Sequence, residues 1–266
     1  MTDWLGLGAN RAHTYINRVD QSYAVADAAR AALRVPEAGL GPDTPIGLAG
    51  SAYGAEGVAG AIERPDYLNG LNVVGAVVGE PLNSVAATFD NIWARDDNLG
   101  YDAVYEMNGL IAAYPDRAER IRSILNDAGR RILDETRGQC QAESVARYSL
   151  IPTRTLTADG RTLKEHFREE PFASLLAEQN LGGAAPTVPV FAAEYAADQI
   201  ISPAQARDLV VQWRARGARV TYREVPGPVT PAGALFDHAA GAVVALESGL
   251  DYLANRFAGQ PIPADS

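Results

Sequence analysis

The stretch Gly50-Ser51-Ala52-Tyr53-Gly54 connects a short apolar run to a run of helix-forming residues. Residues 45–49 before it have the composition of a buried strand, and residues 55–62 after it can open a helix. A sharp turn between a strand and a helix, with a glycine on either side, is the setting of the G-x-S-x-G nucleophile elbow. The pattern is intact except at its centre, where Ala52 stands in place of the serine.

The central residue of such an elbow has a strained backbone, so glycines flank it where a side chain would collide with the neighbouring turn. Its side chain points into the site, which puts Ala52 at the nucleophile position. We expect Ser51, one position earlier, to turn away from a catalytic base, and we place it among the substrate-binding residues. The backbone N–H of Tyr53 is the expected oxyanion donor. The competing interpretation is a small-residue connection without catalytic meaning.

The composition is that of an ordinary globular protein, with 266 residues, 47% hydrophobic and 21% charged. The one cysteine, Cys140, excludes a disulfide within the chain, and three histidines without a second thiol give no metal-ligand spacing, so we predict no metal and no cofactor. A net charge of −10 disfavours nucleic-acid binding. No apolar run reaches the ~20 residues that cross a bilayer, and no signal peptide opens the chain, which as written would be cytoplasmic.

Strand-like apolar runs alternate with helical segments, which predicts an α/β fold with a mostly parallel sheet. The expected strands cover residues 45–49, 71–79, 188–193 and 219–225. The expected helices cover residues 19–33, 55–62, 99–113, 118–136, 203–215 and 241–257. Strands of comparable quality are missing between residues 82 and 182. We therefore predict a helical cap or lid over residues 82–182, inserted into a core made of residues 1–81 and 183–266.

Two further residues follow in the chain order nucleophile, acid, base. Asp198 comes just after the third expected strand, where its carboxylate can orient an imidazole and stabilise its charged form. His238 follows the fourth strand and precedes the last expected helix, where it can act as general base. For an isolated aspartate after a strand, a helix cap or a turn residue is the simpler interpretation. Tyr195 is a candidate for binding substrate, with core packing as its alternative.

With these positions in place, the sequence resembles the secretory lipase family of α/β-hydrolases, the fungal and actinobacterial triacylglycerol lipases. The similarity covers nearly the whole chain, and its segments besides the elbow are Asp3-Trp4-Leu5-Gly6-Leu7-Gly8, His13-Thr14-Tyr15, Leu125-Asn126-Asp127-Ala128-Gly129, Glu178-Gln179-Asn180-Leu181-Gly182 and Leu250-Asp251-Tyr252-Leu253-Ala254-Asn255-Arg256-Phe257. The resemblance implies hydrolysis of carboxylic esters such as acylglycerols, a Ser-Asp-His mechanism without a cofactor, and a helical cap over the acyl site. It maps the family's serine, acid and histidine onto Ala52, Asp198 and His238.

The resemblance also bears on the start of the chain, because Met1 stands where the family pattern is finishing a strand. It implies an N-terminally truncated α/β-hydrolase fold that lacks its first strands and the loop that supplies one oxyanion-hole amide. We expect an exposed sheet edge there, through which the protein could self-associate. Family members are often secreted, so the resemblance leaves the location of this protein open.

Two functions follow from these observations. The first is a carboxylic-ester hydrolase whose activity is impaired, because Ala52 has no hydroxyl to attack the ester. The second is a non-catalytic homologue that keeps an acyl pocket beneath residues 82–182 and binds a lipid or another hydrophobic ligand. The presence of both Asp198 and His238 favours the first function. Departure from the family pattern at Glu194-Tyr195 favours the second.

Overall fold

The structure, a computed structural model, describes residues 2–6, 12–94, 97–98, 102–230 and 233–262. These residues divide by packing into two units. Of the described residues, those within 2–3, 18–84 and 180–262 belong to the sheet unit, and those within 4–17 and 85–179 belong to the helical unit. The segment 4–17 therefore groups with the helices, whereas the sequence-based division had placed it in the core.

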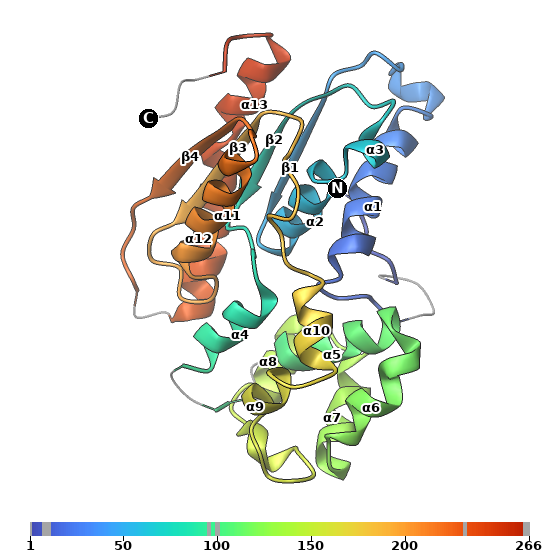
Figure 1. The fold of residues 1–266 in the computed structure, drawn as a ribbon, viewed down its shortest axis with the longest axis vertical. Helices are drawn as coiled ribbons and strands as arrows, with labels where there is room; N and C mark the ends of the chain where they lie inside the picture. Colours follow the sequence, from blue (N-terminus) through green and yellow to red (C-terminus); the bar gives the residue numbers. More distant parts are fainter. Residues whose placement is uncertain (1, 7–11, 95–96, 99–101, 231–232, 263–266) are drawn as a thin grey trace. The chain divides into compact units, whose positions relative to one another are not determined.

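The sheet unit contains four parallel strands in the order β1-β2-β3-β4 (Figure 1). Their bounds are β1 Ile46–Ser51, β2 Val73–Gly79, β3 Val190–Tyr195 and β4 Val220–Val225. The predicted α/β fold with a parallel sheet is thus confirmed, with small shifts at the ends of the strands. The middle of the sheet is buried on both faces, which explains the nearly unbroken apolar runs of β2 and β3.

Helices make the crossover connections that parallel strands require. The helix α1 (Arg18–Ala32) precedes β1, α2 (Tyr53–Ile62) and the short α3 (Pro65–Leu68) lie between β1 and β2, and α11 (Pro203–Ala215) lies between β3 and β4. One helix was predicted over residues 241–257, but this prediction was wrong in two ways, because α12 (Ala234–Ser248) starts earlier and α13 (Leu250–Phe257) is separate. Gly233, with a φ of 98°, ends the preceding loop and lets α12 begin. His238 consequently lies inside α12 rather than before it.

Small residues on the inner face of α12, and a glycine directly after it, allow this helix to lie close to the sheet. A Cβ added at Gly241 would lie 2.4 Å from Oε1 of Glu80, and one added at Gly249 would lie 2.4 Å from Cγ1 of Val77. Ala245, between these two glycines, is completely buried. His238 lies three residues before Gly241, so it shares this face of the helix. The packing of α12 therefore brings the histidine to the carboxyl end of β2.

We expect Gly241→Ala to lower the free energy of unfolding by about 1–3 kcal/mol, the usual range for overpacking. The added methyl group would meet Glu80 and also Cβ of Tyr195, at 2.7 Å, so α12 would have to move away from the sheet. Urea denaturation measures the change. Ala240→Ser, at an exposed position next to it on the same helix, should shift stability by less than about 0.5 kcal/mol. Equal, small effects of both substitutions would contradict this packing.

The helical unit contains seven helices among its described residues. Their bounds are α4 Val85–Ile92, α5 Asp102–Ala113, α6 Ala118–Ser123, α7 Asp127–Thr136, α8 Gln141–Tyr148, α9 Leu163–Phe167 and α10 Phe172–Ala177. The single helix predicted over residues 118–136 is therefore two helices. The break comes at Asn126, whose side chain accepts a hydrogen bond from Gly129 N at 3.0 Å and so caps the start of α7. Among the described residues, none of the helices is long and apolar enough to span a bilayer.

At one end of the sheet, β1 pairs with β2 and exposes Ala49. Backbone groups along the outer edge of such a strand can pair with another chain. Self-association through this edge stays a prediction.

Candidate active site

The elbow predicted from the sequence is present as a strained turn. Ala52 has φ 51° and ψ −121°, a backbone conformation that is rare for a residue with a side chain. It is the N-cap of α2, and its N–H donates a hydrogen bond to Gly79 O at 2.9 Å, which ties the elbow to the end of β2. The surrounding structure therefore holds an alanine in the strained position that a nucleophile occupies in elbows of this kind.

The close approach of neighbouring backbone requires glycine at only one of the two positions that flank Ala52 in the pattern. A Cβ at Gly50 would lie 2.2 Å from the carbonyl oxygen of Gly54, so any side chain there would collide with the backbone of α2. A Cβ at Gly54 would meet nothing within 4 Å. The sequence-based argument for both glycines thus holds for Gly50 and fails for Gly54.

Ser51 does not reach the site as a nucleophile would. Its Oγ is buried without a hydrogen-bond partner among the described residues, and a Cβ added at Gly79 would lie 3.1 Å from it. The hydroxyl therefore points along the sheet toward β2 and lacks contact with a base. A buried Oγ also gives no support to the substrate-binding role predicted for Ser51.

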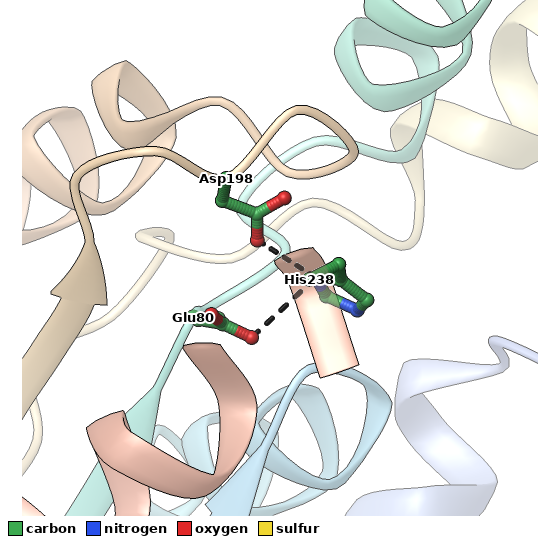
Figure 2. A group of neighbouring side chains, drawn as sticks. All are labelled: Glu80, Asp198 and His238. Atoms are coloured by element: carbon green, nitrogen blue, oxygen red, sulfur yellow. Dashed lines mark hydrogen bonds and ion pairs between the residues drawn. The ribbon is translucent and has the colours of Figure 1, made fainter. Parts of the chain in front are cut away.

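The structure brings Asp198 and His238 together, although 40 residues separate them in the sequence. His238 Nδ1 lies 2.7 Å from Oδ2 of Asp198, as Figure 2 shows. The other carboxylate oxygen accepts hydrogen bonds from the N–H groups of Ile200 and Ile201, at 2.7 and 3.1 Å. These contacts fix the orientation of the carboxylate, whose side chain is fully buried, while that of His238 is 14% exposed. A buried carboxylate on Nδ1 directs the proton to that nitrogen, which is the tautomer in which Nε2 of a triad histidine acts as the base.

A second acid, which the sequence analysis missed, reaches the same imidazole. Glu80 follows the last residue of β2, is completely buried, and has its Oε2 3.4 Å from Nδ1 of His238 (Figure 2). Its φ of 48° is unusual for a glutamate, and its N–H donates to Ala193 O at 2.7 Å. One signal could have found it: the carboxyl end of a parallel strand next to the elbow is where α/β folds bind ligands.

Burial raises the pKa of two glutamates in this region. For Glu80 the pKa rises to about 8, mainly because the charged form loses its hydration; the nearby charge of Asp198 raises it further and His238 opposes the rise. Glu194, the residue on β3 beside Glu80, is also fully buried, and its pKa rises to about 10, again chiefly through burial and then through the charges of Glu80 and Asp198. Both side chains are therefore protonated at neutral pH.

The raised values predict that stability falls as pH rises. Above pH ~4.5 the unfolded chain releases the protons of Glu80 and Glu194, while the folded chain retains them up to about pH 8 and about pH 10. Because the unfolded state then binds fewer protons, the free energy of unfolding should decrease between pH 5 and 9, by at most about 1.4 kcal/mol per pH unit for each group. Glu194→Gln should flatten this slope in urea denaturation. The exposed Glu37→Gln should leave it unchanged, and equal slopes in all three proteins would contradict the prediction.

Glu80, Asp198 and His238 together could also present three ligand atoms to a metal ion, since these atoms lie within 4.8 Å of one another. The spacing of these residues in the sequence did not indicate the group, because its members come from three different parts of the fold. Its geometry fits a proton better than a metal: a distance of 2.7 Å between Nδ1 and Asp198 is that of a hydrogen bond, and a metal on Nδ1 would have to displace the proton. We therefore interpret the group as an imidazole with two acids.

The two tyrosines of the sequence analysis lie in different settings. Tyr53 is the first residue of α2, directly after Ala52, which is the position that the predicted oxyanion role of its N–H requires. Tyr195 is buried, and its hydroxyl donates to Pro228 O at 3.0 Å. A Cβ at Gly227 would lie 2.1 Å from the ring, so Tyr195 packs beneath the loop after β4. This placement does not support a contact with substrate.

Asp237, next to His238, fixes the start of α12 to the neighbouring loops. Its carboxylate accepts hydrogen bonds from Oγ1 and N of Thr230, at 2.5 and 3.0 Å, and from Nε2 of Gln199 at 3.0 Å. The bonds from Thr230, foremost, lower the pKa of this carboxyl. Asp237 thereby joins the loop after β4 to the loop that carries Asp198, and so helps to align the histidine with its acid.

A parallel sheet that carries an elbow after β1, an acid after β3 and a histidine on the helix after β4 places the protein among the α/β-hydrolases. Within that class the chain belongs to the secretory lipase family, which it matches over residues 1–264.

Named relatives support both steps. The chain is 29% identical to a probable inactive lipase of Mycobacterium tuberculosis over 91% of this chain and 52% of that protein, and 26% identical to a secreted triacylglycerol lipase of Malassezia furfur over 76% and 42%. It thus spans about half the length of these curated relatives. Among solved structures, Candida antarctica lipase A in its closed state shares the fold with a TM-score of 0.76 and 25% identity, over 95% of this chain and 59% of that one.

Proposed function

We propose that this protein carries the acid and the base of a carboxylic-ester hydrolase, with Asp198 orienting His238, and that Ala52 leaves the site without its nucleophile. The observation that carries the proposal is the hydrogen bond of 2.7 Å between Asp198 and His238, in a fold whose elbow keeps the strained backbone of a nucleophile. In such a site a serine at position 52 would attack the ester carbonyl while His238 takes its proton. The N–H of Tyr53 would stabilise the oxyanion.

The substrate class follows from the family. Relatives named as secreted triacylglycerol lipases indicate acylglycerols, the esters of glycerol with fatty acids, as the favoured class. We propose residues 82–182 as the helical cap of such a hydrolase, since most of this range, residues 85–179, belongs to a unit separate from the sheet and is mostly helical. As it stands, Ala52 cannot form an acyl-enzyme, so we expect ester turnover by this chain no faster than that of its His238→Ala variant.

The test is covalent labelling with a p-nitrophenyl alkylphosphonate, which reacts with the activated serine of an ester hydrolase. Intact-mass spectrometry should show no adduct on the natural chain and one adduct on the Ala52→Ser variant, assigned to position 52 by peptide mapping. His238→Ala in that variant should slow labelling strongly, because the base is lost. An adduct on the natural chain, or an unreactive Ala52→Ser variant that is folded, would contradict the proposal.

A second candidate function is the binding of a lipid or hydrophobic ligand without catalysis. Alanine at the nucleophile position favours it, as does the similarity to a relative named a probable inactive lipase. Isothermal titration with a medium-chain fatty acid and with a monoacylglycerol ether, which cannot be hydrolysed, should then give saturable binding with a negative heat-capacity change. Failure of both ligands to bind would remove this function.

A further inference from the structure

Two acids reach one imidazole nitrogen from two neighbouring strands. β2 and β3 pair in parallel, with Gly79 opposite Ala193. Glu80, the residue after Gly79, therefore lies beside Glu194, the residue after Ala193. Asp198 comes from the loop after β3 and lies 2.7 Å from Nδ1 of His238, whereas Glu80 lies 3.4 Å from the same atom. One of the two acids is therefore bonded, and the other lies within about 1 Å of a hydrogen-bond position.

The fold holds Glu80 in this place at a cost. The residue has a positive φ, and its carboxyl group is completely buried without a hydrogen-bond partner among the described residues. Burial of such a group is unfavourable unless a partner compensates for it. Gly241 leaves the space that Oε1 occupies, because any side chain there would collide with it. Oε2 lies 3.4 Å from Nδ1 of His238, within ion-pairing distance.

Among the described residues, three titratable groups face Glu80 from the elements around it: His238 on α12, Asp198 in the loop after β3, and Glu194 on β3. Glu194 is protonated at neutral pH and adds no charge. The charge of Asp198 is what raises the pKa of Glu80 beyond the effect of burial, and His238 lowers it. Removal of Asp198 would therefore favour the ionised form of Glu80. It would also take away the carboxylate to which the Nδ1 proton of His238 is bonded.

We propose that Glu80 is a second positioning acid for His238, which holds the Nδ1 proton and orients the ring when Asp198 cannot. The proposal rests on the proposed function in that His238 is the base. Nδ1 keeps its proton in this exchange. Glu80, which is protonated while Asp198 is present, releases its own proton to solvent and then accepts the hydrogen bond from Nδ1 as a carboxylate.

The first experiment uses the natural chain and needs no catalysis. In proton nuclear magnetic resonance, a histidine N–H that is hydrogen-bonded to a carboxylate gives a resonance shifted strongly downfield. The His238→Gln variant should lack this resonance, which assigns it to His238. The resonance should persist in Asp198→Ala and in Glu80→Gln and disappear in the double variant. Glu194→Gln, a buried acid beside Glu80 that does not contact His238, serves as the matched control and should leave it in place. Loss of the resonance in folded Asp198→Ala would overturn the proposal.

Asp198→Ser covers the case in which Asp198→Ala does not fold, because a serine hydroxyl can accept a local N–H bond of the kind that Ile200 donates to Asp198. Near-ultraviolet circular dichroism reports folding for each variant. In Asp198→Ser the ring should again keep its Nδ1 proton through Glu80. A signal that vanishes in this variant and returns only with Asp198 would also contradict a role for Glu80.

The second experiment measures kcat and KM in the Ala52→Ser background. Where a single acid orients the histidine, its replacement lowers kcat by about 10⁴. With Glu80 as a second acid, Asp198→Ala should cost less than about 10²-fold in kcat with KM little changed, and the addition of Glu80→Gln should bring the loss to about 10⁴-fold. An inactive Ala52→Ser parent would contradict the proposed function while the resonance experiment still decides the role of Glu80. Equal losses in the single and double variants would overturn the second acid.

Discussion

Ala52→Ser should raise the turnover of a short-chain p-nitrophenyl ester by at least about 10³-fold. Loss of the nucleophilic serine has lowered kcat by about 10⁶ in another serine hydrolase, which sets the upper limit for the gain. The reason for expecting a large effect is that the elbow already has its strained backbone, and that His238 is already bonded to Asp198 at 2.7 Å. A serine side chain at this position adds only a hydroxyl to a residue whose backbone is already fixed.

The controls for this gain come from the same elbow and the same helix. Ser51→Ala in the serine variant should leave turnover within about twofold, because the Oγ of Ser51 is buried and bonded to nothing among the described residues. His238→Ala in the serine variant should remove the gain. Turnover by the natural chain well above a buffer blank would contradict the assignment of Ala52 to the nucleophile position. A gain that depends on Ser51 would contradict the placement of that side chain.

Gly50→Ala should produce the largest loss of stability of any single methyl group added to the sheet unit, about 3 kcal/mol, at the upper end of the range for overpacking. The added Cβ would lie 2.2 Å from the carbonyl oxygen of Gly54, and the atom it meets is backbone, which cannot rotate away as a side chain can. The elbow would have to open, and with it the contact between β1 and the first turn of α2. Urea denaturation monitored by tryptophan fluorescence gives the change.

The matched control is the same substitution at the other glycine of the elbow. Gly54 has open space around its Cβ position and lies inside α2, where alanine favours the helix by up to about 1 kcal/mol. Gly54→Ala should therefore leave stability unchanged or raise it slightly. Similar losses at both positions would show that the elbow depends on glycine for flexibility rather than for close approach, and would contradict the argument from the clash.

The sequence alone determined most of the architecture. Apolar runs bounded by helical segments predicted all four strands of the sheet and the helices α1, α2 and α11, because strand and helix periodicity is a local property of the chain. It also supplied the family, and with it the chain order of Ala52, Asp198 and His238. Boundaries were less secure: α12 begins before the predicted helix because Gly233 allows a start that periodicity does not reveal.

Only the tertiary structure decided how the side chains meet. Glu80 enters the site because β2 and β3 pair in a particular register and because Gly241 on α12 leaves room for its side chain. The residues next to Glu80 in the sequence predict neither condition. The direction of Ser51 and the burial of Tyr195 depend in the same way on which elements lie opposite them. Local pattern fixes which residues form strands and helices, whereas contacts between residues far apart in the sequence arise only when the sheet pairs and α12 packs against it.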